Sequence, residues 1–157
     1  MNQLEKALQN FWLWADLSPE EYKRGILPKN PNMNPGAEWE TEYEHFQELE
    51  DVFIEEISNE RNFDNPEFLK LLVLAIAIDN EGERLGAFAS SLLSEACIEK
   101  VWCEALWSKF TVAQQVLVFH VKDSKSSHKR QFLHRFIEES GDDFVVSRAQ
   151  YALEHFV

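Results

Sequence analysis

Apolar residues recur at intervals of three and four through almost the whole chain, and this spacing restricts the fold more than any other feature. From residue 65 onward it defines six segments separated by short turns: 68–78, 83–94, 98–109, 112–121, 131–139 and 143–156. Such a stripe is the buried face of an amphipathic α-helix. Only five glycines and five prolines occur, which disfavours the many special turns of an all-β fold. We therefore predict an all-α fold of eight or nine helices.

The first 64 residues show helical spacing of a less regular kind. A first helix is predicted over residues 2–15. Ser18 followed by Pro19 is a typical helix start, and that second helix should end near Gly25. A loop rich in proline and asparagine follows over 28–36, and then an amphipathic helix that reaches residue 59. A length of 157 residues predicts a single domain, 1–157, with N-terminal helices in 1–64 and regular helix pairs in 65–157.

The formal net charge of −13 is concentrated in one stretch. Residues 31–60 contain ten acids and no lysine or arginine, and their apolar stripe places most of these acids on a solvent-facing side. The acids are Glu38, Glu40, Glu42, Glu44, Glu48, Glu50, Asp51, Glu55, Glu56 and Glu60. An anionic surface of this kind steers basic proteins and repels nucleic acid, so we expect a basic protein partner and no nucleic-acid partner.

The opposite bias occurs between Lys122 and Arg135, where five lysines and arginines face one acid, Asp123. A role for this basic segment stays open, because its aromatic residues keep the spacing of a buried helix face. Two tryptophans, Trp14 and Trp107, drift from the apolar stripes of their helices and are therefore predicted to be partly exposed.

The helix pairs of the C-terminal part begin near residues 66, 97 and 126, a period of about thirty. Within them, Ala113, Val116, Leu117 and His120 match Ala149, Ala152, Leu153 and Phe156, each thirty-six residues on. The last helix, which opens with an acid and carries small residues at its contact positions, resembles the inner helix of a HEAT-type repeat. The resemblance covers 65–157 and implies a short right-handed stack of about three helix pairs, which the first sixty residues would cap or flank.

The search for chemistry yields weak candidates. Glu42 and His45 form a Glu-x-x-His pattern, but a di-iron carboxylate site needs this motif twice. His120, His128, His134 and His155 have no acid and nucleophile in a recognisable arrangement, and Cys97 and Cys103 have no zinc-ligand spacing. We therefore expect no catalytic residues, no metal and no cofactor. A metal-dependent enzyme that uses Glu42 and His45 is the least favoured alternative.

The leading hypothesis is a protein–protein interaction module. Size, acidity and helical-repeat style resemble those of small bacterial immunity proteins, which implies binding and neutralisation of a basic toxin. The expected contact residues are Glu38, Trp39, Glu42, Glu44, Glu48, Asp51 and Glu55, with Trp39 as an anchor. The alternative is a self-associating adaptor or structural protein of unknown oligomeric state. No signal peptide or membrane helix is expected, so a cytoplasmic location without a membrane partner is predicted.

Overall fold

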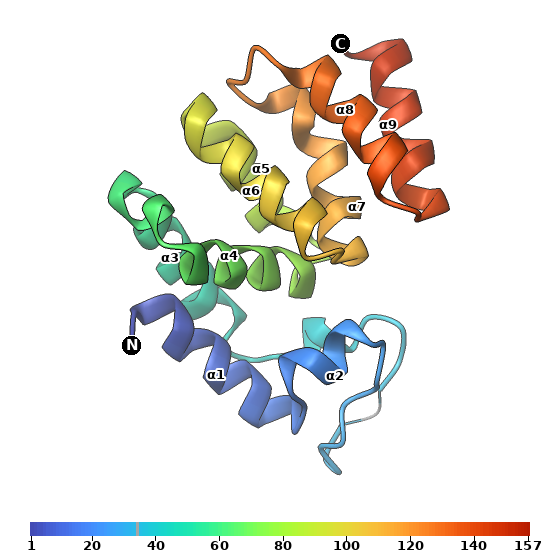
Figure 1. The fold of residues 1–157 in the computed structure, drawn as a ribbon. Coiled ribbons are helices and arrows are strands. Elements are labelled where there is room, and N and C mark those ends of the chain that lie inside the picture. Colours follow the sequence, from blue (N-terminus) through green and yellow to red (C-terminus); the bar gives the residue numbers. More distant parts are fainter. Residues whose placement is uncertain (34) are drawn as a thin grey trace.

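The computed structural model describes residues 1–33 and 35–157, and their secondary structure is helical, which confirms the all-α prediction (Figure 1). The described residues form nine α-helices: α1 (Gln3–Ala15), α2 (Pro19–Lys23), α3 (Phe46–Ile57), α4 (Pro66–Ile78), α5 (Arg84–Leu92), α6 (Glu95–Trp107), α7 (Thr111–His120), α8 (Lys129–Glu139) and α9 (Asp143–His155). Short 3-10 helices are η1 (Trp39–Glu42), η2 (Glu60–Asp64) and η3 (Val121–Asp123).

Local capping chemistry fixes several of these boundaries. At the start of α2, Ser18 Oγ accepts a hydrogen bond from the backbone N–H of Glu21 at 3.1 Å, and the Glu21 carboxylate accepts one from the N–H of Ser18 at 2.9 Å. This reciprocal pair satisfies two backbone donors that a helix start leaves free. Asp142 caps α9 by accepting from the N–H of Val145 at 2.9 Å. These interactions explain why short polar signals between apolar segments locate the helix starts.

The helices form two rows that run from one end of the molecule to the other (Figure 1). Helices α1, α4, α6 and α8 pack in sequence along one row, and α3, α5, α7 and α9 pack along the other. The pairs expected in 65–157 are thus joined by a fourth pair, α1 and α3, made by the N-terminal residues. These residues continue both rows, because α1 packs on α4 and α3 packs on α5.

Gly86 marks a close approach between neighbouring helices of the second row. A Cβ atom at this position would lie 2.4 Å from Cγ1 of Val116, which belongs to α7. Real Cβ atoms do not come this close to a neighbour, so α5 and α7 require glycine here.

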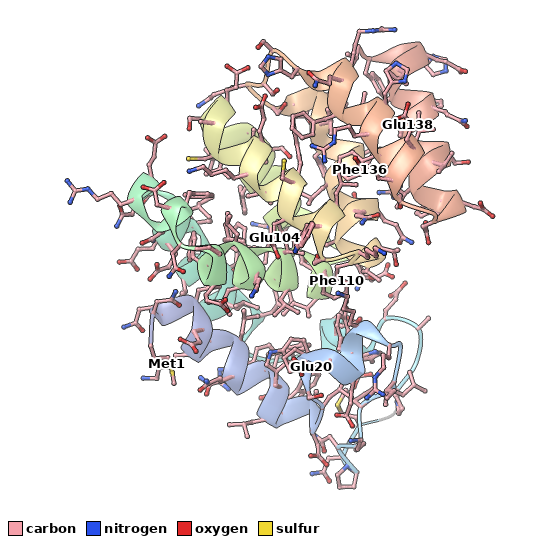
Figure 2. All side chains as sticks on the ribbon, viewed as in Figure 1. Met1, Glu20, Glu104, Phe110, Phe136 and Glu138 are labelled. Carbon is pink, nitrogen blue, oxygen red and sulfur yellow. The ribbon has the colours of Figure 1, made fainter. Side chains whose placement is uncertain are left out.

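Helix α2 is attached to the middle of the array through aromatic contacts. The rings of Tyr22 and Phe110 lie 6.1 Å apart in an edge-to-face arrangement, and Lys23 Nζ lies 5.7 Å from the Phe110 ring centroid. Figure 2 shows Phe110 at this junction, facing the helix that carries Glu20. These contacts hold α2 against the start of α7.

The prediction of one acidic helix that reaches residue 59 is wrong in one respect. Residues 43–45 interrupt it and separate η1 from α3. Tyr43 is buried in an extended conformation with ψ of 110°, and its ring packs edge-on to Phe11 at 5.2 Å. The aromatic residues of α1 draw Trp39 and Tyr43 into one cluster, and a continuous helix does not occur here.

Candidate protein-interaction surface

Six of the predicted contact residues form an exposed acidic surface on η1, the 43–45 break and α3. Its members are Glu38, Glu42, Glu44, Glu48, Asp51 and Glu55, and each is exposed. Helix α3 presents Glu48, Asp51 and Glu55 outward because Leu49, Phe53 and Ile57 occupy the buried face. The acidic surface is therefore the solvent face that the helical spacing predicts.

The acidic surface has little compensation from within the molecule. Among the residues that the structure describes, Arg84 is the one arginine or lysine in an ion pair with an acid of residues 31–60. Its Nη2 atom lies 2.7 Å from Oε1 of Glu50, which faces inward and is not part of the acidic surface. Glu48 contacts only the ring of His45, at 3.0 Å, and Asp51 accepts from Gln47 at 2.9 Å. The acidic surface thus keeps its negative charge.

Trp39 does not lie on the acidic surface. The expectation that it is an exposed anchor for a partner is therefore corrected. Its side chain is 5% exposed and lies nearly parallel to the rings of Phe11, at 5.8 Å, and Trp14, at 6.2 Å. A tryptophan with this much packing contributes to the core between α1 and η1. The apolar stripe of the acidic segment indicated such burial, because Trp39 is its first member.

Glu40 also faces inward, which the helical spacing did not predict. The residue is 6% exposed, and its Oε1 accepts hydrogen bonds from the Tyr22 hydroxyl at 2.9 Å and from Asn80 Nδ2 at 3.2 Å. Burial raises the pKa of Glu40, while its own backbone, Tyr22 and Asn80 oppose the shift. Burial and the nearby negative charge of Glu40 raise the pKa of Tyr22 in turn.

The Glu-x-x-His pattern does not place two ligands on one helix face. Glu42 ends η1, whereas His45 precedes α3 on the other side of the break and contacts Glu48. The side chains that do come together are Glu95, Glu99 and His128, whose ligand atoms lie within 4.8 Å of one another. They already have hydrogen-bond partners, with His128 Nδ1 2.7 Å from Glu99 Oε1. This hydrogen bond raises the pKa of His128 and ties the start of α8 to α6.

The basic segment lies at the other end of the array, around η3 and α8, far from the acidic surface (Figure 1). Its cations contact nearby groups. Lys122 Nζ lies 4.6 and 4.4 Å from the ring centroids of Phe119 and Phe156, Lys129 donates to the Lys122 carbonyl at 3.0 Å, and Arg135 pairs with Glu139 at 3.1 Å. The two charged regions therefore do not neutralise each other within one molecule.

Trp107 is 84% exposed at the end of α6, as its position off the apolar stripe predicted, and Trp14 is partly exposed. Trp107 lines both of two neighbouring hollows, with volumes of about 1150 and 340 Å³. Glu104 also lines both, and Figure 2 shows it on the same side of the array as Phe110. This mixed apolar and charged region is a second exposed feature, outside the predicted contact residues.

No protein-family model, curated protein or solved structure matches this chain. In the part of the chain that the structure describes, every helix is too short or too polar to cross a bilayer.

Proposed function

We propose that this chain is a protein-binding module of the bacterial immunity type, with a HEAT-like helical array, that captures and neutralises a basic toxin in the cytoplasm. It would act by binding rather than by catalysis. The observation that supports this most directly is the acidic surface, whose six carboxylates are exposed and form no ion pair with a lysine or arginine among the described residues. Such a surface accelerates encounter with a cationic protein and excludes anionic ones.

The test is charge reversal at the centre of the acidic surface. The variant Glu42→Lys, Glu44→Lys, Glu48→Lys, Asp51→Lys should bind the protein encoded by the adjacent gene roughly hundredfold more weakly, because electrostatic steering changes association rates by 10–10³. The matched control, Glu20→Lys, Glu138→Lys, Asp143→Lys, Glu154→Lys, changes the net charge equally at exposed positions elsewhere.

Association rates would be measured by stopped flow across a range of salt concentrations. We expect the wild-type rate to fall steeply with salt, and the charge-reversed variant to be slow at every salt concentration. Equal rates for the variant and its control would contradict the proposal.

A second candidate function, self-association, is favoured by the separation of charge between the two ends of the array. The acidic surface of one molecule would pair with the basic segment of the next, around Lys122 and Arg130. Light scattering distinguishes the candidates, since a mass that grows as salt is removed supports self-association, and a constant monomer mass supports capture of a different protein.

A further inference from the structure

A hollow of about 220 Å³ lies beside the acidic surface, between α2, η1 and the start of α7. Its lining includes two aromatic side chains, Tyr22 and Trp39, and three polar ones, Glu40, Asn80 and Gln115, with Leu27 at its side. The volume suits one long side chain rather than a folded segment. The hollow therefore combines aromatic and anionic groups in a space of limited size.

The carboxylate of Glu40 is incompletely bonded in this setting. Oε1 accepts two hydrogen bonds, from Tyr22 and Asn80, whereas Oε2 is buried and accepts none. Buried polar atoms in folded proteins nearly always have a partner, and a buried carboxylate without a cation is rarer still. Neither hydrogen-bond donor to Glu40 carries a charge, so its negative charge has no counterion among these contacts.

We propose that this hollow is a subsite for a cationic side chain, in which the ammonium or guanidinium group of a lysine or arginine from the partner bonds to Glu40. The source of the side chain rests on the proposed function, because the captured protein is basic. A cation fits better than a neutral donor for two reasons. Tyr22 and Trp39 contribute aromatic groups to the lining, and aromatic rings attract positive charge. Glu38 and Glu42, exposed two residues before and after Glu40, add negative potential at the surface.

A cation reaches Oε2 of Glu40 only when neighbouring side chains move, because that atom is buried. Leu27 is 56% exposed and Ile26 is 37% exposed, and both line the hollow. Neither side chain is fully buried, so both have room to change rotamer when a cationic side chain enters the hollow. The wall made by Trp39 is fixed by contrast, since its ring is packed against Phe11 and Trp14.

The direct test uses n-butylammonium and n-propylguanidinium as probes, with n-butanol as the neutral control ligand. Binding would be followed by NMR at the indole N–H of Trp39 and the side-chain amide of Asn80. We expect saturable shifts with both cations and none with n-butanol. The isosteric variant Glu40→Gln should weaken cation binding at least tenfold, whereas the matched variant Glu20→Gln, exposed on α2 and outside the lining of the hollow, should leave it unchanged.

A second variant tests the hollow without removing the Glu40 carboxylate or its hydrogen bonds. Val112→Phe adds an aromatic ring to the lining of the hollow at a residue that forms no hydrogen bond with Glu40, and it should also prevent cation binding. Equal shifts in wild-type protein and Glu40→Gln, or equal binding of n-butanol, would overturn the subsite and leave a hollow that holds only water.

Capture of the partner separates this inference from the proposed function. If the four-lysine variant loses the partner while Glu40→Gln binds it as the wild type does, the subsite proposal fails and the proposed function stands. If the cation probes bind as expected while neither variant alters capture, the proposed function fails, and the hollow remains a cation site of another origin. Loss of capture in both variants supports both proposals.

Discussion

The charged side chains at the two ends of the helical array differ in the contacts that they make within the molecule. At the N-terminal end, the acidic surface on η1 and α3 is exposed and its carboxylates lack lysine or arginine partners. At the C-terminal end, the cations around η3 and α8 contact aromatic rings, backbone carbonyls and carboxylates of their own neighbourhood. The cations of one end are engaged by contacts within the molecule, whereas the acids of the acidic surface have no lysine or arginine partner among the described residues.

The largest expected effect tests whether the two ends belong to one folding unit. Gly86→Val inserts side-chain atoms where a Cβ would already lie 2.4 Å from Val116 Cγ1, so we expect a loss of about 1–3 kcal/mol in unfolding free energy from overpacking. Urea unfolding followed by circular dichroism and by tryptophan fluorescence should give coincident transitions. Gly36→Ala, where a Cβ meets no atom within 4 Å, is the matched control and should change little. Separate transitions for the two probes would show that the ends fold independently.

The next effect compares the inward-facing ion pair of the N-terminal end with a surface pair of the C-terminal end. Arg84→Met leaves the buried carboxylate of Glu50 without its partner, and we expect a loss of about 1–2 kcal/mol, reduced from a fully buried pair because Arg84 is 62% exposed. Arg135→Met removes the exposed pair with Glu139 and should cost less than about 1 kcal/mol. Chemical denaturation measures both. Equal losses would mean that burial of Glu50 has no energetic consequence.

A smaller effect concerns pH, and the two regions should respond with opposite signs. Burial raises the pKa of Glu40, so its ionised form disfavours folding above that pKa, and the disadvantage disappears as pH falls through it. Burial alone would raise the pKa of Glu83, but its contacts with His120 and Arg148 outweigh burial and lower that pKa. The ionised carboxylate of Glu83 therefore stabilises the fold, and this stability is lost as pH falls through the lowered pKa. Glu40→Gln should therefore stabilise the fold at neutral pH and Glu83→Gln should destabilise it, with both differences shrinking in acid.

Thermal unfolding at several pH values measures these differences. A neutral-pH loss of stability in Glu40→Gln would contradict the assigned shift, because that result requires the ionised carboxylate to favour folding. The same result would also weaken the case for a cation subsite at this position.

The smallest effect tests the repulsion within the acidic surface. Asp51 lies one turn from both Glu48 and Glu55 on α3, so Asp51→Asn should stabilise the fold by about 0.2–0.5 kcal/mol at low salt. Glu138→Gln, on α8 beside His134 and Arg135, should give no such gain. Adding salt should remove the gain in Asp51→Asn, because it screens the same repulsion. A gain that persists in high salt would point to a cause other than charge.

The elements of the fold followed from local patterns that the sequence displays directly. The cap at Ser18 with Pro19 and the apolar stripes of the helices from residue 66 onward appear where they were predicted. Neighbouring residues decide such features, so sequence reasoning reaches them.

The candidate site was predictable only in part. The six exposed acids lie opposite the apolar face of their segment, which the spacing reveals. The inward positions of Trp39 and Glu40 depend on Phe11, Tyr22 and Asn80, which belong to three other parts of the chain. The apolar stripe indicated that Trp39 is buried, but no spacing rule within residues 38–59 indicates that Glu40 faces inward.

The sequence by itself determined that this chain is helical, where its helices begin, and that one short stretch holds most of its excess negative charge. Only the tertiary structure decided that this stretch breaks at residues 43–45, that Glu40 and Glu50 turn inward, and that α1 and α3 extend both rows of helices. The physical reason is range. Helix periodicity and capping act over three or four residues, whereas burial of a particular side chain depends on neighbours that are distant in sequence.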